Sequence, residues 1–312
     1  MRGGDRPSPM KAANEVSILL RTVLGDERFP VDVESVALDY SKKFPDPITK
    51  VVGESLDTFE GMLRPSSKKP AWHIIYNNDT DYRGRERFTL AHEFGHYLLH
   101  RRPLTAAVIA GGLKAGEAKS RSFACSPMEQ HTWKGSEDAR MEEDADTFAS
   151  FLLMPMDDYR RQVAGRDIDL DLLRHITGRY GVSLTAAVRK WIEFTDLRAA
   201  MVVARDGFAL WGRASGAALK SGIFIPSGME IPELSIAAQG PAAQQGESVR
   251  PIELAEGIWT FKRGSEPVRE LTIFSERLGK SLSILLFEDR PHHTTLDEEP
   301  VWDTYDQFLA RG

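Results

Sequence analysis

The chain has 312 residues, of which 41% are hydrophobic and 28% charged, and its 40 basic and 46 acidic side chains give a net charge of −6. This composition is typical of a globular protein with more than one domain. The negative charge argues against broad, non-specific binding to nucleic-acid phosphates. One cysteine, Cys125, excludes an internal disulfide, and the chain has neither a run of about 18 apolar residues nor an apolar leader. We therefore expect a cytoplasmic protein that does not enter a membrane.

The first part of the chain predicts two helices and a small sheet. Apolar residues recur at helical spacing over 10–25 and again over 30–44, where Asp32 is placed to cap the second helix. Three short extended runs follow, at 49–55, 59–65 and 71–78. They end directly before a segment, 88–100, that has the apolar spacing of a helix.

The middle of the chain predicts a long connection and then a second long helix. Residues 101–137 are rich in glycine and serine without clear periodicity, so we expect no regular element there. Helical spacing returns over 136–155, where Ser136 or Asp138 can cap the start and Pro155 ends the run.

The last third predicts a helical pair and then β-structure. Residues 170–194 indicate a helix, a turn at Gly181 and a second helix, which resembles a helix-turn-helix unit. From Ala199 onward the chain changes to short extended runs separated by glycines, at 199–214, 222–228, 257–264 and 269–289. Residues 237–248 have the composition of a flexible loop.

The predicted helix 88–100 carries His92, Glu93 and His96 in the pattern HExxH. Residues four apart share one face of a helix, so the two imidazoles can supply two ligands of a tetrahedral zinc ion. Glu93 lies beside them and is placed to act as the general base of a metallopeptidase. The alternative is that both histidines are ordinary buried side chains and that the match is accidental.

The third ligand decides the class of zinc site. The longer pattern HExxHxxGxxH is excluded, because Leu99 stands where it needs glycine and Arg102 where it needs histidine. His100 is rotated further round the helix than His96, so we expect it to contact backbone or solvent rather than the metal. A carboxylate from the second long helix, 136–155, is the other known solution.

Two segments resemble the ImmA/IrrE family of metallopeptidases. They are "RFTLAHEFGHYLLH", from Arg87 to His100, and "EEDADTFASFLLMP", from Glu142 to Pro155. The chain departs from the family pattern in two ways, because Asp144 replaces a usual glutamate and the connection between the segments is long. The resemblance implies a gluzincin-like metallopeptidase domain that binds zinc, or manganese in its place.

The resemblance also implies different roles for the acidic residues of the second helix. Glu142 is the third metal ligand, and Asp146, one turn on, orients His92 or His96 by accepting its other ring N–H. We expect Glu143 and Asp144 to form a solvated acidic face instead. The apolar residues of this helix are expected in the core, namely Phe148, Leu152 and Leu153.

The expected reaction is metal-assisted peptide hydrolysis, in which Glu93 takes a proton from the attacking water and passes it to the leaving amine. The strand 71–78 could pair with an extended substrate. His131 and Tyr97 are the candidates for stabilising the oxyanion.

The resemblance implies an α+β protein in three parts: a zinc metallopeptidase domain at 1–160, a helix-turn-helix segment at 161–198 and a β-rich, GAF-like sensor domain at 199–312. The implied substrate is a helix-turn-helix transcriptional repressor. Its cleavage would release genes of the DNA-damage response, other stress responses or mobile elements.

An alternative function comes from a different class of protein, a DNA-binding regulator with a structural zinc site. In that hypothesis the second helix of the pair reads the major groove. It offers only Arg189 and Lys190 as cations, whereas phosphate contacts usually need several. We therefore expect the helical pair to pack against the peptidase core and to bind no nucleic acid stably. Thiolate gating of the metal by Cys125 is still less expected.

Overall fold

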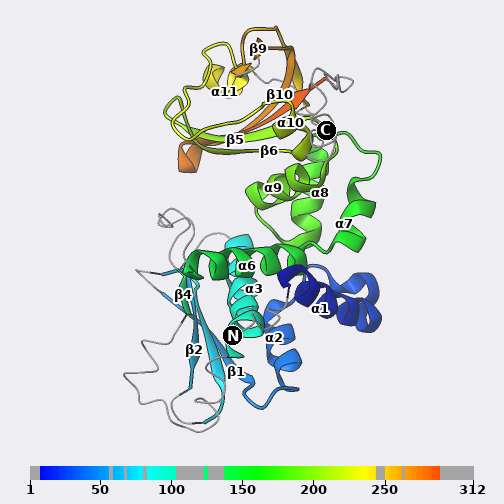
Figure 1. Cartoon of the computed structure of the whole chain (residues 1–312), viewed down its shortest axis with the longest axis vertical. Coiled ribbons are helices and arrows are strands. Elements are labelled where there is room, and N and C mark those ends of the chain that lie inside the picture. The colour runs from blue at the N-terminus through cyan, green and yellow to red at the C-terminus, as the bar shows by residue number, and fades with distance from the viewer. Residues whose placement is uncertain are drawn as a thin grey trace, which may run out of the picture.

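The computed structural model describes residues 8–55, 59–66, 69–79, 83–102, 123–125, 137–243, 250–261 and 264–288. They form a mixed α+β structure, as predicted, with a four-stranded sheet and its helices at one end and a five-stranded sheet at the other (Figure 1). A group of helices lies between the two sheets. None of the helices in these ranges is long and apolar enough to cross a membrane.

The chain begins with two capped helices. Helix α1 spans Pro9–Leu24, and the short helix η1, Gly25–Arg28, follows it. Helix α2 spans Val33–Ser41 and is capped by Asp32, whose Oδ1 accepts from the backbone N–H of Ser35 at 3.2 Å. Both longer helices and this cap agree with the prediction.

The first sheet has the strand order β1-β3-β2-β4. Its strands are β1 (Ile48–Glu54), β2 (Gly61–Pro65), β3 (Trp72–Asn77) and β4 (Phe123–Cys125). Strands β1 and β3 are parallel, and the other pairs are antiparallel. The sequence did not predict β4, because three residues are too few to show the alternation of a strand.

Two long helices, α3 (Arg83–Leu99) and α6 (Glu137–Leu153), pack against each other beside this sheet. They approach closely at Gly95, where a Cβ atom would lie 3.1 Å from Cδ1 of Phe148 and 3.3 Å from Cα of Ala145. A glycine facing an alanine therefore lets the polar residues of the two helices meet.

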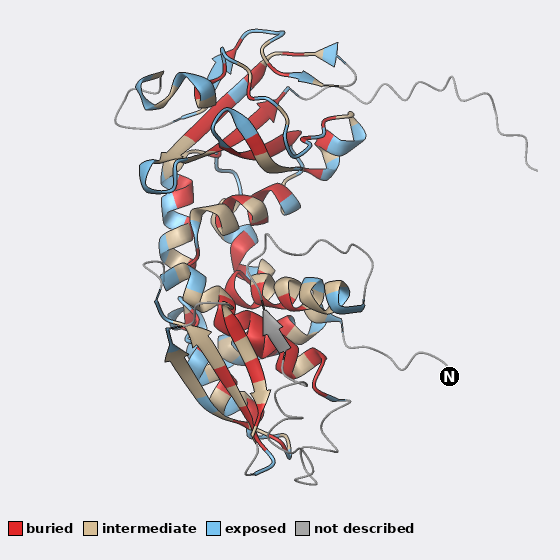
Figure 2. Ribbon diagram, turned by 90° about the vertical axis from the view of Figure 1, so that its left-hand side faces the viewer, coloured by how far each residue is buried: buried red, intermediate tan, exposed pale blue. Residues whose placement is uncertain are grey.

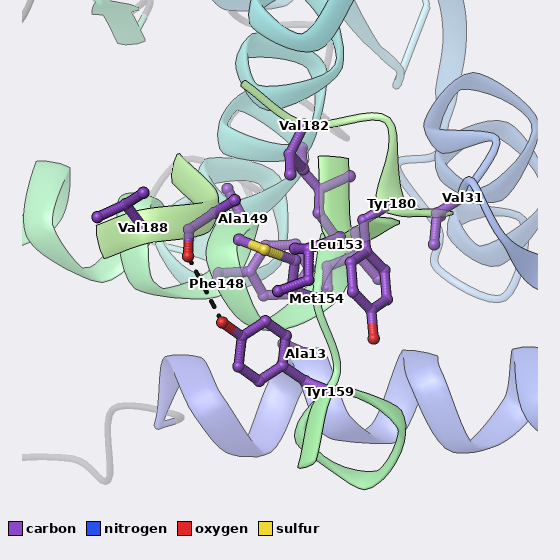
Figure 3. Close-up of a cluster of buried hydrophobic side chains, with 14 of the residues drawn as sticks. Ala13, Val31, Phe148, Ala149, Leu153, Met154, Tyr159, Tyr180, Val182 and Val188 are labelled. Atoms are coloured by element: carbon purple, nitrogen blue, oxygen red, sulfur yellow. Dashed lines mark hydrogen bonds between the residues drawn. The ribbon is translucent and has the colours of Figure 1, made fainter. Parts of the chain in front are cut away.

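Three shorter helices continue the chain after Pro155: α7 (Met156–Val163), α8 (Leu170–Tyr180) and α9 (Leu184–Phe194). Gly181 has a φ of +62°, a left-handed conformation that ends α8. Side chains of α6, α7, α8 and α9 share one apolar core (Figure 3). In that core the Tyr159 hydroxyl donates to the backbone carbonyl of Ala187 at 3.5 Å.

The second sheet is antiparallel, with the order β6-β5-β11-β10-β7. Its strands are β5 (Ala199–Arg205), β6 (Phe208–Ala214), β7 (Ile252–Leu254), β10 (Val268–Ser275) and β11 (Lys280–Phe287). Small elements surround it: α10 (Gly216–Lys220), α11 (Ile236–Gln239), η3 (Pro241–Ala243), η4 (Glu276–Leu278) and the pair β8 (Thr260–Phe261) and β9 (Gly264–Ser265).

Two predictions for this region are wrong. Residues 222–228 form no strand. Their alternating apolar residues, Ile223 and Ile225, are buried in the core, with Ile225 lying against Gly212 of β6, but the segment does not pair with a strand as part of a sheet. The segment 237–248 is also not all loop, since α11 and η3 occupy its first residues.

The second sheet has a different apolar core on each face. One face, with Met201, Val203 and Ile284, joins the core of the first sheet and the central helices. The other face forms a separate cluster around Trp259 and Leu285. Figure 2 shows these buried layers along the length of the molecule. The helices α8 and α9 therefore have apolar neighbours on both sides, and the three-part division at 160 and 198 stays a prediction.

Candidate metal centre

The three residues of the HExxH pattern lie in the middle of α3 and are buried. Nε2 of His92 is 3.0 Å from Nε2 of His96. The carboxylate of Glu142, from α6, reaches both rings, with its oxygens 3.2 Å from Nε2 of His92 and 3.3 Å from Nε2 of His96. The structure thus brings together the three predicted ligands as a group that could hold a metal ion.

The donor atoms fit a divalent metal. Ligand atoms bound at 2.0–2.1 Å in a tetrahedral zinc site lie about 3.3 Å from one another, close to the observed separations. Asp146 accepts from Nδ1 of His92 at 2.9 Å, so the neutral ring of His92 carries its lone pair on Nε2. That lone pair faces His96 and an anionic carboxylate, and a cation between them would relieve the repulsion.

The ionisation of these groups reflects the same arrangement. Burial lowers the pKa of His92, but the hydrogen bonds to Asp146 and Glu142 outweigh burial and raise this pKa to about 10. Burial would raise the pKa of Glu142, yet its hydrogen bonds to His92 and His96 hold that pKa far below its usual range. Burial and the neighbouring His92 lower the pKa of His96. The two carboxylates, Asp146 and Glu142, therefore favour a positive charge at this point of the structure.

His100 contradicts our expectation that it contacts backbone or solvent. Its Nδ1 lies 2.9 Å from Nδ1 of His96, and its Nε2 lies 3.8 Å from Oδ2 of Asp144. Each histidine ligand therefore has a partner for its Nδ1, which is Asp146 for His92 and His100 for His96. The i, i+4 spacing could have indicated this second contact, but the choice depends on the side-chain rotamer.

Glu93 points from α3 toward the start of strand β2. A Cβ atom at Gly61 would lie 2.7 Å from Oε1 of Glu93 and 2.5 Å from Cγ2 of Thr89. Gly61 is therefore needed for the carboxylate to lie against the strand. The sequence analysis missed Gly61, because nothing local marks which strand residue will face a helix.

The structure does not place the remaining candidates, Tyr97, His131 and Cys125, at the proposed metal ligands. The hydroxyl of Tyr97 donates to the backbone carbonyl of Asp46 at 3.1 Å, so Tyr97 is directed away from the metal ligands. His131 lies outside the described residues. Cys125 belongs to β4, and only its backbone is described.

Of the two cations of α9, Lys190 is buried and Arg189 is partly buried. Lys190 is 1% exposed, and its Nζ donates to Oγ of Ser150 at 3.2 Å and lies 3.5 Å from the ring centroid of Phe151. Burial lowers the pKa of Lys190 to about 8. Burial, reinforced by Arg213, lowers the pKa of Arg189, whereas Asp146 opposes that shift.

One comparison with known proteins covers the residues of this site. Residues 49–191 match the model of a peptidase family described as the IrrE N-terminal-like domain. No curated protein sequence matches the chain. Among solved structures, the chain is similar to one described as "Mycobacterium tuberculosis transcriptional regulator", with 14% identity and a TM-score of 0.49 over 90% of this chain and 81% of that one.

Proposed function

We propose that the chain is a zinc-dependent endopeptidase of the ImmA/IrrE family, because residues 49–191, which contain both predicted motifs, match the IrrE N-terminal-like peptidase domain. The observation that carries this proposal is the convergence of His92, His96 and Glu142 beside the buried carboxylate of Glu93. A peptidase of this family acts on a protein substrate. We propose that the substrate is a helix-turn-helix transcriptional repressor, whose cleavage relieves repression of stress-response or mobile-element genes.

The residues divide the work of hydrolysis among them. His92, His96 and Glu142 would hold the metal, while Asp146 and His100 fix the two imidazoles from behind. A bound zinc or manganese ion would supply Lewis-acid polarisation of the peptide carbonyl and activation of water. Glu93 accepts the proton of the attacking water and then protonates the leaving amine.

The strand order of the first sheet shows that an extended substrate would have to pair with a strand other than the predicted one. Strand β3 is hydrogen-bonded on both sides, to β1 and to β2, so the predicted pairing of a substrate with 71–78 is wrong. Among the described strands of this sheet, β1 and β4 form the two edges. Because β2, which pairs with β4, starts at Gly61 beside Glu93, we propose the outer edge of β4 as the place where a substrate strand is added.

The DNA-binding alternative has less support. Its recognition helix would be α9, but Lys190 is buried against Ser150 and Arg189 is partly buried. Contacts to phosphates need cations at the surface. We propose three parts for the chain: a metallopeptidase domain at 1–160, a helix-turn-helix segment at 161–198 and a GAF-like domain at 199–312. We also propose that the protein is cytoplasmic.

Replacement of Glu93 by Gln tests the enzymatic proposal. The variant should keep the metal and the fold but lose cleavage of a repressor by roughly 10²–10⁴-fold, because it removes the base and leaves the ligands in place. Cleavage would be followed by gel electrophoresis and mass spectrometry, with repressors encoded beside the gene as substrates. The matched control is Glu143→Gln, an exposed neighbour on α6. Undiminished cleavage by Glu93→Gln would refute the mechanism.

A further inference from the structure

The outer face of the first sheet carries a row of basic side chains. In the strand register, Lys50 of β1 is paired with His73 of β3, and His73 is paired with Arg64 of β2. Residues paired across neighbouring strands point to the same face of a sheet. The buried residues that alternate with them, such as Trp72 and Ile74, face the helices, so this cationic row, Lys50, His73 and Arg64, faces outward.

Within the described residues, no carboxylate forms an ion pair with this row, although Glu54 lies on the same face of β1, four positions from Lys50. Lys50, Arg64, His73 and the nearby Lys69 make no ion pair with any described residue, and Nε2 of His73 has no hydrogen-bond partner there. Burial, and then Lys50, Lys69 and Arg64, lower the pKa of His73. The positive potential is local, since the whole chain has a net charge of −6.

An apolar row lies beside the cationic row on the same face. Ile75 of β3 is paired with Val52 of β1 and with Met62 of β2. Each of these residues is two positions along its strand from a member of the cationic row, a rise of about 6.6 Å. All three are only partly buried. The face therefore offers positive charge and apolar surface side by side.

We propose that this outer face of the sheet docks an acidic, partly apolar segment of a protein partner, the substrate itself, away from the metal centre. The proposal rests on the proposed function for the identity of that partner. Charge complementarity selects an anionic segment. The apolar row favours protein over nucleic acid, whose backbone presents phosphates and sugars.

The position of the face suits a substrate held for cleavage. Strand β2 carries Gly61, which contacts Glu93, and Arg64 three residues further along. This separation along the strand is about 10 Å. A segment docked on the outer face could therefore continue round the β4 edge to the metal centre.

The docking surface is tested by direct binding, with the full-length protein carrying Glu93→Gln. The probe is a short fluorescent peptide of glutamate and leucine, and its lysine and leucine counterpart is the control. Fluorescence anisotropy should show saturable binding of the acidic peptide alone. The double variant Lys50→Glu, Arg64→Glu should weaken that binding by about tenfold or more, because like charges then face each other. Arg166→Glu, an exposed charge reversal on the connection between α7 and α8, should change it less than about twofold.

Three results would overturn the proposal: no binding of the acidic peptide, an equal loss in Arg166→Glu, or binding of a short DNA duplex in place of the peptide. The metal content of the double variant should equal that of the parent protein, since neither side chain touches the metal centre. Because peptide binding is measured without cleavage, it separates the two hypotheses. An active enzyme that ignores the peptide would disprove only the docking surface, and a protein that binds the peptide but cuts no repressor would disprove only the proposed function.

Discussion

The helix pairs α3–α6 and α8–α9 both bury charged or polar side chains on faces that are otherwise apolar. In α3–α6, two imidazole nitrogens and a carboxylate converge on one point, with separations of 3.0 to 3.3 Å. In α8–α9, the ammonium of Lys190 is instead satisfied by Ser150 and by the faces of Phe151 and Phe194. Burial of a charge is therefore no mark of a functional site, whereas convergence of electron-pair donors on one point is.

Loss of a proposed metal ligand should produce the largest effect. If it did not, the contrast between α3–α6 as a metal site and α8–α9 as a structural pair would be wrong. We expect His96→Ala or Glu142→Ala to abolish stoichiometric metal binding, because each removes one of the three proposed ligands and leaves the others unable to complete the site. Metal content is measured by mass spectrometry after purification in zinc. Circular dichroism checks that the helices remain.

The control for the carboxylate is Glu143→Ala, which changes the exposed neighbour of Glu142. That variant should keep a full complement of metal. If Glu142→Ala kept its metal while Glu143→Ala lost it, the third ligand would have to be reassigned.

The sequence could predict that His92, His96 and Glu142 come together because part of the constraint is local. His92 and His96 share a helix face at any i, i+4 spacing, and the resemblance supplied Glu142 and Asp146. Other features depend on how distant elements meet. Examples are the contact of Gly61 with Glu93 and the interior place of β3, neither of which leaves a periodic signal.

The helix pair α8–α9 also shows what could and could not be predicted from the sequence. The turn at Gly181 and both helices of 170–194 were predicted from apolar spacing and the glycine. The burial of Lys190 was not, because a lysine on a helix is ordinarily exposed. Only the packing of α9 between α6 and the second sheet shows that this charge is in the interior.

Replacement of Lys190 by Met tests the second helix pair. The folded-state pKa of Lys190, about 8, lies below the value of 10.5 for a free lysine. Between these two pKa values the unfolded chain binds more protons than the folded chain, so stability should rise with pH. The destabilisation caused by the buried ammonium should therefore disappear as Lys190 loses its proton. Between about pH 7 and pH 10, the free energy of unfolding should rise by up to roughly 3 kcal/mol more in the parent protein than in Lys190→Met.

Urea unfolding at several pH values measures this difference, with Lys11→Met, an exposed lysine of α1, as the control. Lys11→Met should follow the parent protein throughout. Identical pH profiles for the parent and for Lys190→Met would mean that the ammonium reaches solvent, and the contrast between the two helix pairs would weaken.

The smallest effect is expected at Asp146, which we propose to orient His92 rather than to bind the metal. Its carboxylate fixes the ring of His92 through Nδ1 and also lies within the electrostatic reach of Arg189 on α9. Asp146→Asn keeps the shape but removes the charge, so metal affinity should fall by about 10–100-fold while the ligands stay in place. Competition with a metal chelator measures the change, and Glu143→Gln controls for the loss of one negative charge on α6. An affinity equal to that of the parent protein would show that packing within α3–α6 orients His92 by itself, and that Asp146 is a solvated acid like its exposed neighbour.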